Sequence, residues 1–351
     1  MKKYLSLITF AFLQLFAGPV QTTDLNTEGN DLSPGMRTFY DDTLIDIVGP
    51  KLVHDQDAVK KPIPANNGKK IQFRGFNPLP KALTALTEGV TPEGGKLDMF
   101  TIEATVAQYG YYITTSDMLN LTHVDPIIVE SLKLLGDQAG VTLDTITRNV
   151  LVGGTNVMYA PKINASTGAE TEVLSRSDLD LTAQLTVDLI DQVVAELEAA
   201  NVPKFDDGFY HAIIHPYTKY VIMKDEMWRE PHKYVDTNAI YSGEIGEIGG
   251  VRFKVSSEAK IWRGEEDDCP EGLAVFACLF YGKGAYATTE ITGGGLKTIV
   301  KQLGSAGSAD PLDQRSSTAW KATKVAEILH PDYLIRVECC SARKSRVAEA
   351  N

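Results

Sequence analysis

The stretch that most constrains the fold runs from Asp125 to Gly154 and reads DPIIVESLKLLGDQAGVTLDTITRNVLVGG. Its apolar residues recur at steps of three and four, about 3.7 on average, which keeps one stripe along a straight helix. Asp125 is a suitable N-cap, Pro126 suits the first turn, and the Gly153-Gly154 pair ends the pattern. The stripe consists of Ile128, Leu132, Leu135, Ala139, Leu143, Ile146 and Val150.

A helix over residues 125–152 is roughly 40 Å long at 1.5 Å per residue. The sequence contains no set of helices of matching length, so a helical bundle is not favoured. We therefore expect a single long helix that crosses the body of a flat or elongated molecule.

Upstream of this helix the sequence predicts a long hairpin. Ile71, Phe73 and Phe76 form a short strand pattern, and residues 100–106 alternate between apolar and polar side chains. Between them, residues 77–96 carry three prolines and three glycines, and a connection of that length is uncommon inside a compact domain. A lone two-stranded hairpin is also marginal in water. We expect a projecting hairpin that docks on another surface, such as a neighbouring subunit.

Downstream, helix and strand patterns are mixed without regular alternation, which predicts an α+β fold rather than a doubly wound sheet. A helix is expected to open at Ser177, with Asp180 in an imperfect capping box, and to run to Asn201. The chain is expected to close with two paired strands around a His330-Pro331 turn. The remaining expected elements are strands at 209–214, 251–255, 273–281, 325–329 and 333–340, a helix at 217–228, and a loop at 304–317.

Composition excludes several classes of protein. The 351 residues are 43% hydrophobic and 23% charged, which are globular values that exclude disorder and allow two domains or one large one. With 34 Lys and Arg against 46 Asp and Glu, the net charge of -12 leaves no basic surplus to grip nucleic acid. The four cysteines include no CxxC pair, and we interpret them as buried free thiols in a reducing compartment.

The N-terminus admits two interpretations. Lys2 and Lys3 precede an apolar run from Tyr4 to Phe16, which is typical of a secretory signal, but polar residues interrupt it and no small-x-small cleavage site follows. The alternative is an apolar N-terminal arm. No later segment reaches the length of a membrane span.

Candidate chemical sites are weak. His211 and His215 would share a face on a helix and hold a metal, but the strand-like composition and Pro216 favour core or turn histidines. The glycines at 243–250 and 293–295 match no phosphate-binding loop, and the acidic run 265–268 is typical of a solvated turn rather than a calcium site. We assign no catalytic, cofactor-binding or metal-binding residue.

The order of arm, hairpin, long helix, mixed domain and closing strands resembles the Hong Kong 97-type major capsid protein of tailed bacteriophages. The resemblance covers nearly the whole chain from Gly35, and its branch is the one typified by the coat of coliphage N-four. Leu13–Gly18 is similar to the opening of many phage coat proteins, which favours the arm over the signal. The other similar stretches are Gly35–Tyr40, Gly68–Phe73, Ile214–Pro216, and Gly246–Phe253 followed by Ser256-Ser257.

The resemblance implies a structural protein of the virion that assembles in the host bacterial cytoplasm, with no enzymatic activity, no cofactor and no membrane. The implied partners are further copies of the chain, in hexamers and pentamers, and a portal protein, with scaffold and decoration proteins left open. The shell would enclose double-stranded DNA without sequence-specific binding. The implied parts are an N-terminal arm (1–60), an extended hairpin loop (61–116), a peripheral domain with the spine helix (117–174), an axial domain (175–320) and returning C-terminal strands (321–351).

Arg74, Lys81, Glu88 and Glu93 on the hairpin are candidate intersubunit contacts, and a solvated tip is the alternative for each. Two other functions stay open. A secreted or cell-surface protein is suggested by residues 2–16 and by the glycosylation sequons at Asn120 and Asn164. A metal-dependent enzyme would use His211 and His215.

Overall fold

The computed structural model describes residues 53–91, 94–122, 127–164, 167–225, 246–305, 310–342 and 344–351. All elements below belong to one unit, Val48–Asn351. The signal segment and residues 1–52 of the expected arm lie outside the described residues, as do Asp125 and Pro126 of the expected helix cap. Among the described residues, no helix combines the length and the apolar character needed to cross a bilayer.

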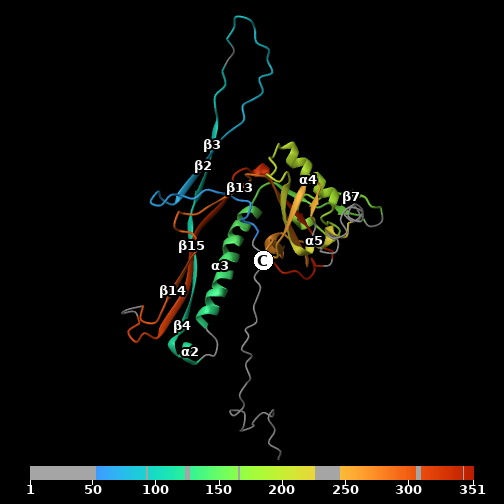
Figure 1. Ribbon diagram of the computed structural model, residues 1–351. Helices are drawn as coiled ribbons and strands as arrows, with labels where there is room; N and C mark the ends of the chain where they lie inside the picture. Colours follow the sequence, from blue (N-terminus) through green and yellow to red (C-terminus); the bar gives the residue numbers. More distant parts are fainter. Residues whose placement is uncertain are drawn as a thin grey trace, which may run out of the picture. The chain divides into compact units, whose positions relative to one another are not determined.

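Two main sheets organise the unit (Figure 1). The five-stranded sheet has the order β1-β13-β15-β14, and β4 pairs with the other edge of the long strand β15. Its strands are β1 (Val59–Lys60), β4 (Ala107–Ser116), β13 (Tyr286–Thr289), β14 (Lys297–Lys301) and β15 (Arg315–Ile328).

The seven-stranded sheet has the order β5-β16-β12-β8-β10-β9, with β11 paired to β12. Two small hairpins, β2–β3 and β6–β7, complete the strands. The strands of this sheet are β5 (Val157–Tyr159), β8 (Tyr210–Ile214), β9 (Glu247–Ile248), β10 (Val251–Val255), β11 (Ile261–Arg263), β12 (Ala274–Tyr281) and β16 (Leu334–Cys339). The hairpin strands are β2 (Lys70–Phe76), β3 (Met99–Thr105), β6 (Lys162–Ile163) and β7 (Glu170–Thr171).

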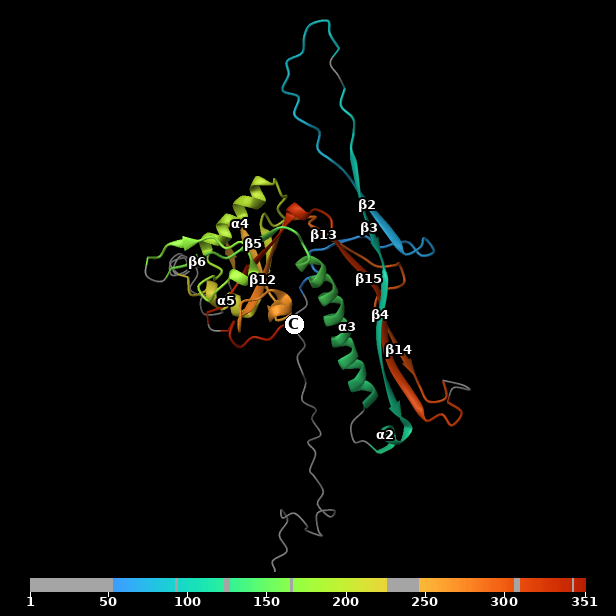
Figure 2. The same cartoon turned by 180° about the vertical axis from the view of Figure 1, so that it is seen from behind.

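The expected long helix is confirmed as α3, Ile127–Val152, and Gly153 follows it as predicted. Figure 2 shows α3 lying along β4 and β15. Leu135 and Ala139 of the predicted stripe pack on Trp320 and Ala322 of β15. Toward the end of α3 the buried residues become polar, and Asp144, Thr147 and Arg148 are among them. The sequence pattern does not predict this polar half because its partners are distant in the chain.

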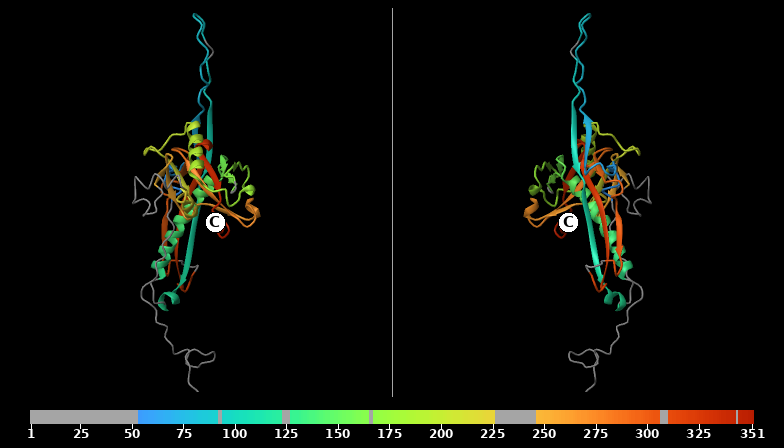
Figure 3. Two further views of the ribbon diagram at one scale, coloured as in Figure 1. Left: turned by 90° about the vertical axis from the view of Figure 1, so that its right-hand side faces the viewer. Right: turned by 90° about the vertical axis from the view of Figure 1, so that its left-hand side faces the viewer.

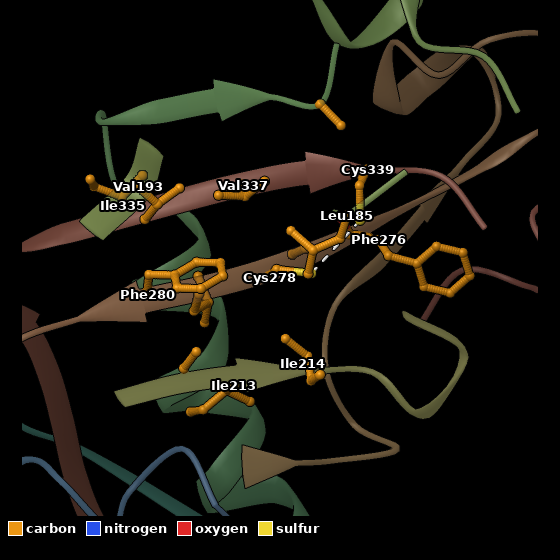
Figure 4. Packing of buried hydrophobic residues seen from close by; sticks show 14 of the residues in the cluster. Leu185, Val193, Ile213, Ile214, Phe276, Cys278, Phe280, Ile335, Val337 and Cys339 are labelled. Carbon is orange, nitrogen blue, oxygen red and sulfur yellow. Dashed lines mark hydrogen bonds between the residues drawn. The ribbon is translucent and has the colours of Figure 1, made fainter. Parts of the chain in front are cut away.

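The main core lies between the seven-stranded sheet and α4, Val187–Ala199. Figure 4 shows Val193 of α4 beside Ile335 and Val337 of β16. All eight residues of β12 are buried. The four cysteines are free and buried, as expected, and the Cys278 and Cys339 sulfurs lie 3.8 Å apart across neighbouring strands.

Several expected elements are confirmed, and two need correction. The strands at β8, β10 and β12 and the acidic turn η3 (Glu265–Asp267) lie where the sequence placed them. The helix expected at 217–228 is α5 (Pro216–Ile222), which ends before the described residues 223–225, and residues 226–228 lie outside the described residues. The helix expected from Ser177 is wrong in its start: residues 176–178 form a short 3-10 turn, η2 (Arg176–Asp178), and α4 begins only after Thr186, whose side chain caps it. Asp180 instead accepts hydrogen bonds from Thr182 and Ala183 within a turn.

The two closing strands are not paired, which corrects the second expectation. β15 belongs to the five-stranded sheet, whereas β16 lies in the seven-stranded sheet between β12 and β5, and the short turn η5 (Pro331–Tyr333) separates them. β15 also begins at Arg315, inside the expected loop. Its inward positions include Ser316, Thr318 and Ala322, and such small or polar residues give no apolar alternation that would predict a strand.

Candidate assembly surfaces

The loop between β2 and β3 is the most exposed part of the described chain. Every described residue from Phe76 to Met99 is exposed, and Figure 3 shows this loop extending beyond the two sheets. Apolar side chains are exposed along its whole length. They are Phe76 (65%), Leu79 (59%), Leu83 (86%), Leu86 (77%), Val90 (62%), Leu97 (73%) and Met99 (49%).

The base of this hairpin is anchored to its own chain. Phe73 of β2 and Ala104 of β3 pack against Ala287 of β13, and the seven-residue strands pair in register from Lys70–Thr105 to Phe76–Met99. Beyond the last strand pair, Asn77 donates a backbone and a side-chain hydrogen bond to Asp98, which joins the two ends of the loop. The hairpin is therefore fixed at its base, and its apolar loop carries no contact with a described core cluster.

Residues 107–116, which we expected within the extended hairpin, pair instead with β15 along ten positions. The chain thus passes from β3 into β4 with only Val106 between them, and it changes its partner strand at that residue. The hairpin proper spans residues 70–105.

Three of the four candidate contact residues can be located. Arg74 is exposed on β2, and Lys81 and Glu88 are exposed in the loop. None of the three forms an ion pair with another described residue. Glu93 lies outside the described residues. The structure therefore leaves Arg74, Lys81 and Glu88 available for contacts with another molecule.

His211 and His215 do not form the pair that a shared metal requires. His215 caps α5, where its ring nitrogen accepts a hydrogen bond from the Tyr217 amide, and burial lowers its pKa to about 4. His211 lies on β8, as the strand composition indicated. Within the described residues, no group of three or more potential ligands has the geometry for a metal ion.

His211 instead lies between two carboxylates. Its Nδ1 is 2.8 Å from an Asp57 oxygen and its Nε2 is 2.9 Å from an Asp207 oxygen. Lys254 and Tyr281 also donate hydrogen bonds to Asp57, the first at 2.6 Å and the second at 2.8 Å. These partly buried side chains tie Asp57 to strands β8, β10 and β12.

The segment Val53–Asp57 joins both main sheets to α3. The His54 ring contacts Asp144 of α3 at 2.6 Å, and the Tyr286 hydroxyl of β13 donates to the His54 carbonyl at 2.7 Å. Asp55 forms an ion pair with Lys324 of β15, and its Oδ1 lies 2.9 Å from the Lys324 Nζ. No local sequence signal links these residues, because each partner lies roughly 90 positions or more along the chain.

The glycine-rich segments are turns. Gly249 and Gly250 adopt φ values of 55° and 82° in the two-residue connection of β9 and β10, as a tight hairpin turn with a right-handed twist requires. Gly293 has a φ of 82° in the turn before β14. These positions agree with the sequence interpretation and give no support to a phosphate-binding loop, and Gly243 lies outside the described residues.

No protein-family model matches this sequence, and no curated protein matches it. Solved structures do match its fold. A chain of the cyanophage Pam1 capsid is similar with a TM-score of 0.66 at 11% identity, covering 92% of this chain and 100% of that one. The cyanophage P-SCSP1u capsid gives 0.64 at 13% identity, covering 91% and 98%, and the capsid of Helicobacter pylori bacteriophage KHP30 gives 0.62 at 12%, covering 92% and 100%.

These likenesses establish the fold. The chain has the mixed α+β fold of Hong Kong 97-type phage capsid proteins, with α3 as the spine helix. The match includes nearly all of each compared chain, so the fold is present as a whole and not as a fragment.

Proposed function

We propose that this protein is the major capsid protein of a tailed phage or prophage, which self-assembles into the icosahedral shell around a double-stranded DNA genome. The observation that carries this proposal is the exposed apolar loop on a capsid-type fold. Burying a leucine contributes roughly 1.5–3 kcal/mol relative to leaving it exposed. The free chain gains only a fraction of that at Leu79, Leu83 and Leu86, whereas a chain whose loop lies on a neighbour gains the remainder at each of them.

Ring and shell formation follow from the way such a contact repeats. The loop and the surface it would cover are different parts of the chain. When each copy covers one neighbour and is covered by another, the contact is heterologous and passes from copy to copy. In closed rings of five and six copies that are tiled into a shell, the apolar loop of every copy is buried on a neighbour. Arg74, Lys81, Glu88 and Glu93 would then add polar contacts around the apolar ones.

The finer assignments belong to the same proposal. We place the chain in the branch typified by the coat of coliphage N-four, with a portal protein as a further partner and scaffold or decoration proteins left open. We retain the division into arm, hairpin loop, peripheral domain, axial domain and C-terminal strands. One adjustment is supported by the pairing of β16 with β12, which favours assigning β16 to the axial part.

The test replaces Leu83 and Leu86 together by serine. Both side chains are highly exposed, so we expect unchanged thermal stability of the free chain but no closed particles in negative-stain images. Leu174→Ser is the matched control, because Leu174 is 78% exposed outside the loop. The larger deletion of residues 77–96 should likewise give a soluble folded chain that forms no shells. Normal shells from either loop variant would overturn the assigned role of the loop.

A further inference from the structure

The face of the five-stranded sheet opposite α3 carries an unneutralised group of lysines. Trp320 and Ala322 of β15 point toward α3, so the alternate positions of β15 point to the opposite face. Lys321 is one of these, and its Cα partner on β14 is Lys297. Lys301 lies on the same face of β14, four residues farther along. All three side chains are exposed.

Two lysines directly opposite each other on paired strands repel, and such a pair is unfavourable in the isolated sheet. None of Lys297, Lys301 and Lys321 forms an ion pair with another described residue. Where β15 pairs with β14 and β4, at Arg315–Lys324, the outward positions of the three strands include no Asp or Glu. The outward carboxylate of β15 is Glu327, six residues beyond Lys321 and opposite Ala287 of β13, where the β2–β3 hairpin covers the sheet. The charge of the three lysines therefore has no counterpart on the part of the face where they lie.

The same face is hollowed next to Lys301. A shallow hollow of about 250 Å³ is lined by Tyr112 and Thr114 of β4 and by Lys301, Arg315 and Ser317. Arg315 is already engaged by Asp310, whose carboxylate also accepts its backbone amide. The β2–β3 hairpin covers only the far end of this sheet, near Ala287 and Val325. The lysine face is thus open along β14 and the adjoining half of β15.

The complementary surface is present on the same chain. The exposed face of α4 carries Asp188, Asp191 and Glu196, and no Lys or Arg occurs in this helix. None of these three carboxylates forms an ion pair with another described residue. Asp188 and Glu196 are separated by about 12 Å along the helix axis, and Lys297 and Lys301 by about 13 Å along the strand.

We propose that the lysine face, Lys297, Lys301 and Lys321, binds the acidic face of α4 of a second copy of this chain. Within one copy the lysine face lies on the five-stranded sheet, α4 packs on the seven-stranded sheet, and the two lie apart in both views (Figures 1 and 2). The contact is therefore between copies, and in a repeating assembly each copy offers its lysine face to one neighbour and its α4 to another. Duplex DNA is the less favoured occupant, since a chain of net charge -12 repels phosphates at distance. The proposal rests on the proposed capsid function for its setting.

The decisive experiment exchanges the charges. The variant K297E/K321E and the variant D188K/D191K should each abolish closed particles, and the chain that combines all four substitutions should regain them. K224E/K344E is the control of equal charge change on exposed lysines elsewhere that form no ion pair with another described residue, and it should assemble normally. Normal particles from K297E/K321E would overturn the proposal, as would failure of the combined variant when each separate variant folds and its circular dichroism matches wild type.

A second readout does not depend on shells. An equal mixture of unlabelled and ¹⁵N-labelled wild-type protein is treated with a carbodiimide, which condenses a lysine amine with a carboxylate into an amide. Mass spectrometry should find mixed-label peptides joining the lysine face to α4. If wild type forms no particles but these links appear, the capsid function fails and the contact stands. If particles form without these links, the contact fails. Nuclease-protected DNA lost only in K297E/K321E particles would assign the face to DNA and overturn the proposal.

Discussion

His211 shows how a single residue holds the segment Val53–Asp57 on the seven-stranded sheet. Burial alone disfavours a charged imidazole, but the hydrogen bonds to Asp57 and Asp207 outweigh that effect and raise the pKa of His211. Burial likewise opposes ionisation of Asp57, and the hydrogen bonds from His211, Lys254 and Tyr281 still lower its pKa to about 2. The charged His211 therefore stabilises the folded chain together with Asp57, Asp207, Lys254 and Arg252, the charged groups around it.

The direction in which the free energy of unfolding changes with pH follows from these two pKa shifts. Because the pKa of His211 is higher in the folded chain, its contribution is complete below the ordinary value of 6.5 and is lost as the pH rises through the folded value. The contribution of Asp57 is complete above 3.8 and is lost only as the pH falls toward about 2. His215 acts in the opposite sense, because its lowered pKa costs stability as the pH falls from 6.5 to about 4.

We predict that His211→Gln destabilises the chain by about 3 kcal/mol at pH 5.5, the usual effect of breaking a buried ion pair. The loss should be clearly smaller at pH 9, because the contribution of the charged imidazole is lost as the pH rises through the raised pKa of His211. Urea unfolding of both proteins at both pH values measures the difference, and the comparison cancels the opposing titration of His215. An equal loss at the two pH values would show that the charge of His211 is not involved.

At the scale of elements, the long pairing of β4 with β15 depends on close approach of the two backbones. A Cβ atom on Gly110 would lie 2.7 Å from the Trp320 carbonyl oxygen, closer than real contacts allow. Trp320 is also the residue that packs on α3 and donates a hydrogen bond to Gln138 at 3.0 Å. Gly110 therefore controls the position of the surface on which the spine helix lies.

Gly110→Ala should destabilise the chain by about 1–3 kcal/mol, the usual cost of inserting an atom into a filled space. Gly95→Ala is the matched control, since a Cβ there meets nothing within 4 Å. Replacing a glycine in open space by alanine is neutral or slightly stabilising, so the two variants should differ in sign. Chemical denaturation monitored by tryptophan fluorescence distinguishes them, and equal midpoints would contradict the close approach at Gly110.

Elements with local signals were predictable from the sequence. The spacing of Leu135 and Ala139 and the Gly153-Gly154 stop defined α3, and the apolar run before His215-Pro216 defined β8. β15 was only partly predicted, because its small and polar inward residues hide the alternation. The lysine face was not predictable at all, since only the register of β14 on β15 brings Lys297 opposite Lys321.

At the scale of the whole molecule, two different kinds of surface are left without partners. One is apolar and lies on a loop fixed at its base, and the other is a lysine face on the five-stranded sheet with an acidic face on helix α4. In the proposed shell both contacts are heterologous, because each copy gives one surface to one neighbour and receives the complementary surface from another. In the assembly that we propose, a chain with this fold buries its apolar loop and pairs its charged faces on neighbouring copies.

The most direct test of self-assembly is the state of the purified wild-type chain at high concentration, measured by sedimentation velocity with negative-stain imaging of the same sample. We predict large, uniform particles with closed polyhedral outlines, in equilibrium with rings or free chains at lower concentration. A single species of about 38 kDa that persists at every concentration, with no particles in the images, would contradict the account.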